Sequence, residues 1–103
     1  MATGLPGRKG GPQDAFRHAY ASAVVARYIS PDAVLYINEK WENDKNSPHD
    51  KMDRHNNRVG MNIGESGFSI AESVNYLILQ SNTQKYSDDD LYWLDESEWS
   101  DGF

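Results

Sequence analysis

The residues best suited to chemistry lie between Met52 and Gly64, in the stretch MDRHNNRVGMNIG. On a helix, Asp53, Asn56 and Asn57 occupy one side at spacings of three and four, next to an apolar stripe. Adjacent amides in mid-helix are poor helix formers, which indicates a role for them. Asp53 and Asn57 could position a water, a metal or a substrate hydroxyl. The alternative is that the two amides only bond to neighbouring loops.

A second polar group lies upstream, where Asp14 and His18 are four residues apart. On a helix the carboxylate can hold one imidazole nitrogen and leave the other for proton transfer or a metal. Arg17 lies beside them and could steady an anionic group. The structural alternative is a capping acid with a histidine bonded to backbone. Glu39 and Glu42 offer either a further carboxylate for catalysis or a solvated helix face.

A metal centre would require three or four ligands to converge from separate helices. The candidates are Asp14, His18, Glu39 or Glu42, His49 and Asp53. The chain has no cysteine and no H-E-x-x-H motif, and it lacks the glycine patterns of phosphate and dinucleotide sites. We therefore assign no metal ligand and expect no cofactor, although a divalent metal remains a weaker alternative.

Helix start signals explain how these groups are positioned. A proline preceded by serine or followed by an acid stands near positions 12, 31 and 48, and Ser69 with Glu72 forms a capping box. We expect helices over 12–29, over 30–43, from 47 to about 64 or 67, and from 69 onward. The prediction is an all-α fold, a compact bundle of about four helices in which the first crosses the third. That crossing would turn Asp14 and His18 toward Asp53 and Asn57.

Charge divides the chain into two parts. Residues 1–60 carry nine bases against seven acids, whereas residues 61–103 carry one base against nine acids. The acidic part disfavours nucleic acid as a partner, because it repels phosphate backbones. No apolar run is long enough to span a membrane, and the N-terminus has no signal-peptide core.

Composition suggests three segments along the chain. Residues 1–11 are rich in glycine and are expected to form a flexible leader. Residues 12–85 form the expected helical domain. Residues 86–103 interleave aromatic and acidic side chains and form a tail that we expect to dock in part.

Two motifs in this order resemble a known group of proteins: DAFRHAYASA at residues 14–23 and MDRHNNRVG at residues 52–60. They resemble a little-characterised helical bacterial domain found at the C-termini of wall-associated and Rhs-type polymorphic toxins. The resemblance covers about residues 11–64. Its polar signature falls on the following residues: Asp14, Arg17, His18, Asp53, Asn56, Asn57 and Gly60. It also implies a His-Glu pair on the second helix, where this chain has Asn38 and Glu39.

The resemblance implies a toxin-like setting: a domain secreted as part of a larger bacterial protein, or delivered to a target cell, with a cognate immunity protein as partner. We expect a small antibacterial hydrolase acting on a cell-envelope substrate, peptidoglycan or phospholipid. The expected catalytic residues are Asp14, His18, Asp53 and Glu39. The expected substrate-binding residues are Arg17, Asn56 and Asn57. The alternative is a non-catalytic interaction module that uses its acidic, aromatic tail.

Overall fold

The computed structural model describes residues 5–41, 47–80 and 90–99, and within 39–41 it describes the backbone alone. These residues form four α-helices and a short 3-10 helix, with no strand among them. The elements are α1 (Pro12–Tyr28), α2 (Pro31–Trp41), α3 (Pro48–Ser66), α4 (Ile70–Gln80) and η1 (Glu96–Glu98). The predicted all-α fold is confirmed.

The helices begin and end at the residues that favour such boundaries. In α3, the Ser47 hydroxyl accepts the Asp50 N–H at 3.0 Å, and Gly67 ends the helix at φ 85°. Ser30 caps α2 and Ser69 caps α4 in the same way. The start signals predicted at Ser30, Ser47 and Ser69 are therefore confirmed as caps, whereas α1 begins at Pro12 without a side-chain cap.

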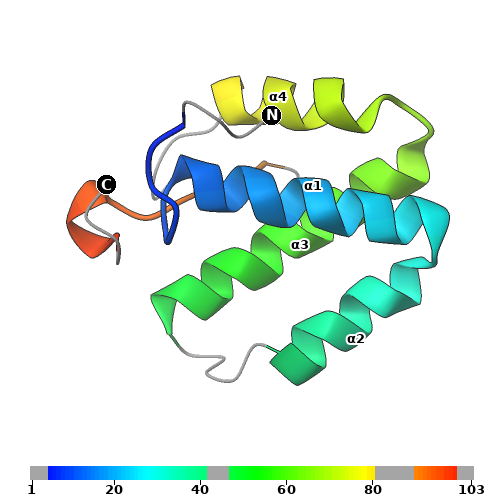
Figure 1. The fold of residues 1–103 in the computed structure, drawn as a ribbon, viewed down its shortest axis with the longest axis horizontal. Helices are drawn as coiled ribbons and strands as arrows, with labels where there is room; N and C mark the ends of the chain where they lie inside the picture. The colour runs from blue at the N-terminus through cyan, green and yellow to red at the C-terminus, as the bar shows by residue number, and fades with distance from the viewer. Residues whose placement is uncertain (1–4, 42–46, 81–89, 100–103) are drawn as a thin grey trace.

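The centre of the fold is the crossing of α1 over α3 (Figure 1). A Cβ atom built on Gly60 would lie 2.2 Å from the carbonyl oxygen of Ala19, and one on Gly64 would lie 2.4 Å from that of Ala23. Only glycine allows the two backbones to approach this closely. The small residues thus bring the polar faces of both helices within hydrogen-bonding reach.

The remaining helices flank this pair. In Figure 1, α4 and α2 lie on opposite sides of the α1–α3 crossing, and each contacts both helices. Phe16, Val59 and Val74 belong to the main apolar core, in which α1, α3 and α4 meet. None of the described helices has the length and apolar character needed to cross a bilayer.

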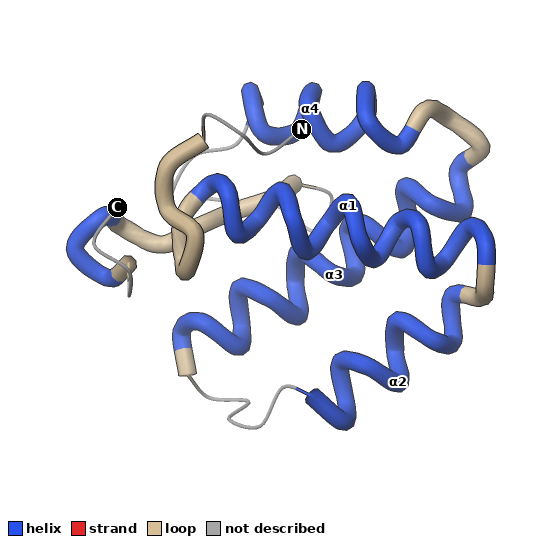
Figure 2. The backbone as a smooth tube through the Cα atoms, viewed as in Figure 1, coloured by secondary structure: helices blue, strands red, loops and turns tan. Residues whose placement is uncertain are grey.

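Segments from both ends of the chain pack together at the start of α1 (Figure 2). The Leu94 N–H donates to the Gly10 carbonyl at 2.7 Å, and Leu91 is fully buried. Gly7, which lies in the expected leader, accepts the Asp14 N–H at 3.1 Å. The described part of residues 1–11 therefore helps to begin α1; residues 1–4 lie outside the described chain.

Candidate functional site

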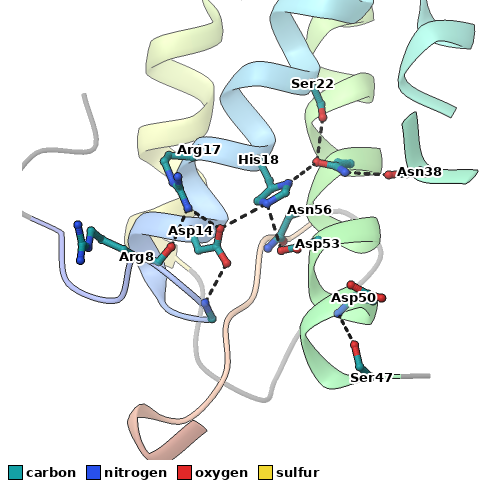
Figure 3. A network of polar contacts seen from close by, with 12 residues as sticks. Arg8, Asp14, Arg17, His18, Ser22, Asn38, Ser47, Asp50, Asp53 and Asn56 are labelled. Atoms are coloured by element: carbon teal, nitrogen blue, oxygen red, sulfur yellow. Dashed lines mark hydrogen bonds and ion pairs between the residues drawn. The ribbon is translucent and has the colours of Figure 1, made fainter. Parts of the chain in front are cut away.

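The imidazole of His18 lies between two carboxylates that come from different helices (Figure 3). Its Nε2 is 3.4 Å from Asp14 Oδ1, one turn earlier on α1, and 3.3 Å from Asp53 Oδ1 on α3. Its Nδ1 is 3.0 Å from Asn57 Oδ1, also on α3. The predicted crossing of the first and third helices thus brings these four side chains together.

The hydrogen bonds of Asn57 determine which nitrogen of the His18 ring donates to it. Its Nδ2 donates to Asn38 Oδ1 at 2.7 Å, and its Oδ1 accepts the Ser22 hydroxyl at 3.0 Å. Since Asn57 Oδ1 is an acceptor, His18 Nδ1 must donate to it. The other nitrogen, Nε2, is then the one that faces both carboxylates and can gain or lose a proton.

Asp14 is held rigidly on the opposite side of the ring. Its side chain is 6% exposed, and its Oδ2 accepts the Gly10 N–H at 2.8 Å. Its Oδ1 accepts from Arg17 Nη2 at 2.9 Å, and the same Nη2 donates to the Arg8 carbonyl at 2.7 Å. The fixed acid can therefore orient His18, as the sequence predicted from their spacing.

The cluster separates the pKa values of its members. Burial lowers the pKa of His18, but the hydrogen bond to Asp14 and the charge of Asp53 outweigh it and raise the pKa to about 9. Burial raises the pKa of Asp53 to about 6, with partial compensation by the charge of His18. Burial alone would raise the pKa of Asp14, but its hydrogen bonds to His18 and the Gly10 N–H lower it. Near neutral pH, a charged imidazole therefore stands between ionised carboxylates.

The same three side chains could hold a divalent cation instead of a proton. A tetrahedral ion with bonds of about 2.0–2.1 Å keeps its ligand atoms roughly 3.4 Å apart. The 3.4 Å and 3.3 Å separations around His18 Nε2 match that spacing, and ligand atoms of Asp14, His18 and Asp53 all lie within 4.8 Å of one another. Asp53 Oδ1 is buried and, among the described residues, makes no hydrogen bond.

A cavity of about 370 Å³ borders this cluster between α1, α2 and α3. His18 and Asn57 contribute its polar end, and Arg17 also lines it. The other lining residues are Ala21, Ser22, Val25, Val34 and Ile37. A substrate in the cavity would therefore lie against the imidazole.

Other predicted site residues lie elsewhere. Asn56 is fully buried and forms hydrogen bonds with both the carbonyl and the N–H of Tyr92. The structure therefore does not bring it to His18. His49, a metal candidate, has its Nε2 3.1 Å from the Glu98 carbonyl oxygen. The backbone of Glu39 lies in α2, but its side chain is outside the described atoms, as is all of Glu42.

Sequence reasoning missed two members of the cluster, Ser22 and Asn38. Ser22 follows His18 by four residues on α1, and this spacing alone could have placed it on the same face. Asn38 is 2% exposed and lies one turn after buried Val34 in α2. Two signals were available for it: an amide in an otherwise apolar stripe, and the position at which the resemblance implies a histidine.

Comparison with known protein families identifies the family to which the chain belongs. Residues 3–88 match the family described as Domain of unknown function (DUF6973). No curated protein and no solved structure matches the chain. Since the match covers most of the sequence, including Asp14, His18, Asp53 and Asn57, the chain belongs to the DUF6973 family.

Proposed function

We propose that this chain is a small hydrolase domain of a secreted bacterial effector of the antibacterial toxin type, acting on a cell-envelope substrate. One observation carries the proposal: an imidazole held between two carboxylates also forms the wall of a cavity. Groups with separated pKa values beside a cavity are the usual arrangement for acid–base catalysis.

The pKa values support the following roles in the proposed reaction. Asp53, with a pKa of about 6, is ionised near neutral pH and takes a proton from the attacking water. His18, with a pKa of about 9, is protonated and gives its proton to the leaving group as the scissile bond of the substrate breaks. Asp14 and Asn57 hold the ring, and Arg17 steadies an anionic part of the substrate. Glu39 remains a candidate second carboxylate.

The setting rests on resemblance and on charge. The DAFRHA and MDRHNN motifs resemble domains at the ends of wall-associated and Rhs-type toxins, which supports secretion or delivery within a larger protein and a cognate immunity protein. The formal net charge of −6 disfavours nucleic acid. An envelope substrate, peptidoglycan or phospholipid, fits both observations.

Two observations favour this proposal over a non-catalytic interaction module. A buried network that only fixed helix register would be sealed, but His18 remains 29% exposed and lines the cavity. The interaction module would use the aromatic tail. In the described residues 90–99, however, Tyr92 is buried and Trp99 Nε1 donates to the Leu94 carbonyl at 2.9 Å.

The test is bacterial growth during expression of the chain in the cytoplasm or, with an export signal, in the periplasm. His18→Ala and Asp53→Asn are compared with Asn62→Ala, a control at an exposed position on α3. All variants are first shown to be folded by circular dichroism. Killing from the periplasm alone, lost in both cluster variants and kept in the control, supports the proposal. Killing from the cytoplasm, or growth in every case, overturns it.

A second measurement distinguishes acid–base catalysis by His18 and Asp53 from catalysis by a bound divalent cation. The purified chain is assayed on envelope extracts after dialysis against a chelator, and again after addition of Zn²⁺. Activity that survives chelation supports the roles given to His18 and Asp53. Activity that requires Zn²⁺ would instead make Asp14, His18 and Asp53 ligands of a metal-bound water.

A further inference from the structure

The side chains that line the cavity beside His18 restrict the kind of ligand that can bind there. Away from the polar end, it is lined by apolar side chains of two helices: Ala21 and Val25 from α1, with Val34 and Ile37 from α2. A concave, mostly apolar surface with polar groups at one end is suited to an amphiphilic ligand. Building on the proposed hydrolase function, we infer that this groove binds the acyl chain of a phospholipid, with the phosphate at Arg17.

The polar groups of the groove argue against a sugar or peptide of the cell wall. Such ligands bind through many hydrogen bonds, and a buried polar group left unpaired weakens binding. Asn57 Oδ1 already accepts from His18 and Ser22, and its Nδ2 already donates to Asn38. Three of the four hydrogen-bonding positions of this amide, which lines the groove, are therefore used within the protein, whereas an acyl chain needs no such partners.

The apolar surface continues beyond the groove along α1. Tyr28 follows Val25 by three residues and Ala21 by seven, so it lies on the same side of the helix. Tyr28 and Ile29 are each 74% exposed. A tyrosine at the edge of an apolar surface suits a lipid–water interface, because its ring is apolar and its hydroxyl is polar. The groove thus opens toward a surface that a lipid could cover.

Arg17 supplies the charge that a phospholipid head requires. It lines the groove, and its side chain is 54% exposed. Nη2 is used by Asp14 and the Arg8 carbonyl, which hold the guanidinium in place. Within the described part of the chain, Nη1 and Nε have no hydrogen-bond acceptor, so they remain available to a phosphate.

The experiment measures binding by calorimetry, independently of catalysis. The probes are dodecylphosphocholine below its micelle concentration, dodecyl maltoside, glycerophosphocholine and muramyl dipeptide. Ile37→Asp places a charge in the groove, at a residue 37% exposed, and Leu79→Asp makes the same change on α4, at a residue 82% exposed. The proposal predicts that dodecylphosphocholine binds best and that Ile37→Asp weakens it by roughly tenfold or more, while Leu79→Asp leaves it unchanged.

Three outcomes would overturn the inference: no binding of dodecylphosphocholine, tighter binding of muramyl dipeptide, or equal weakening by Ile37→Asp and Leu79→Asp. Arg17→Gln should weaken the binding of dodecylphosphocholine but not that of dodecyl maltoside. Equal effects on both probes would show that Arg17 does not bind the phosphate. If killing depends on His18 but the groove binds no amphiphile, the hydrolase proposal stands and this inference fails. If dodecylphosphocholine binds but killing is independent of His18, the reverse holds.

Discussion

Asn56 and Asn57 are adjacent and chemically identical, yet they belong to two different regions of the molecule. Asn56 is fully buried, donates to the Tyr92 carbonyl at 2.8 Å and accepts the Tyr92 N–H at 3.1 Å. It holds residues 90–94 against α3 and does not reach the cavity beside His18. Asn57, 3% exposed, bonds His18 instead and lines the cavity.

The difference shows how one helix serves two purposes. Successive residues of a helix are about 100° apart, so neighbouring amides face different partners. One partner is a backbone segment whose polar groups must be paired, and the other is an ionisable ring. Residue type cannot separate a structural clamp from a site residue, but the partners of each amide can.

The largest effect should come from a change that disrupts both regions at once. Gly60→Ala would place a Cβ 2.2 Å from the Ala19 carbonyl and force α1 away from α3. An alanine normally stabilises a helix relative to glycine by about 1 kcal/mol. Here we expect the free energy of unfolding to fall by about 3 kcal/mol, the upper end of the usual range for overpacking, because the overlap is with backbone. Urea denaturation measures it.

The control for this prediction is Asn62→Ala, on the exposed side of the same helix. It should leave the stability unchanged or slightly higher. A stabilised Gly60→Ala variant would show that α1 and α3 are not in backbone contact.

The next effect separates the two amides. Asn56→Ala would leave the buried N–H and carbonyl of Tyr92 without their partner. We expect the free energy of unfolding to fall by about 2–3 kcal/mol, because two buried groups lose their partner and each costs about 1–3 kcal/mol. Activity per folded molecule should stay near the wild-type value, since Asn56 does not reach His18. Denaturation and a rate assay on the folded fraction test both statements.

The inverse prediction concerns Asn57→Asp. The new carboxylate still accepts from His18 and Ser22, and it adds a negative charge beside the ring. It can no longer donate to Asn38 Oδ1, so the Asn38 amide must turn its otherwise unpaired Nδ2 toward the carboxylate. The pKa of His18 should therefore rise further, which makes the ring a weaker acid and lowers the rate by roughly tenfold. NMR titration of His18 and the high-pH limb of the rate profile should both move upward. A variant that loses stability as much as Asn56→Ala, with an unchanged His18 pKa, would remove the distinction between the amides.

Much of the site could be predicted from spacing, for a physical reason. The four-residue step from Asp14 to His18 and the glycines of α3 depend on helix geometry and backbone approach, which local sequence determines. The roles of Asn56 and Asn57 depend on which segment covers each side of α3. That segment, residues 90–94, is distant in sequence. Asn38 likewise reaches the cluster only through the packing of α2 against α3.

The effect that is smallest per step of the measurement, at most about 1.4 kcal/mol per pH unit, is a slope of stability against pH that belongs to one region alone. The pKa of His18 is about 9 in the folded state against an ordinary 6.5, so its stabilisation is complete below pH 6.5 and is lost as pH rises through 9. The pKa of Asp53 is raised from 3.8 to about 6, so its contribution is lost earlier, as pH rises through 6. Between pH 6.5 and 9, the slope should therefore come mainly from His18.

Urea denaturation across pH 6.5–9 compares the wild type with His18→Gln and Asn56→Ala. His18→Gln should flatten the fall in stability, because the titrating group with the raised pKa is gone. Asn56→Ala should lower the stability at every pH and keep the slope, because the hydrogen bonds between Asn56 and the Tyr92 backbone involve no titrating group. The loss of the His18 charge also raises the pKa of Asp53 further, so the control is His18→Gln combined with Asp53→Asn. A slope that survives in this double variant would place the titration outside the Asp14–His18–Asp53 cluster. A slope lost in Asn56→Ala would mean that the two sides of α3 act as one unit, and that the amides differ less than their contacts imply.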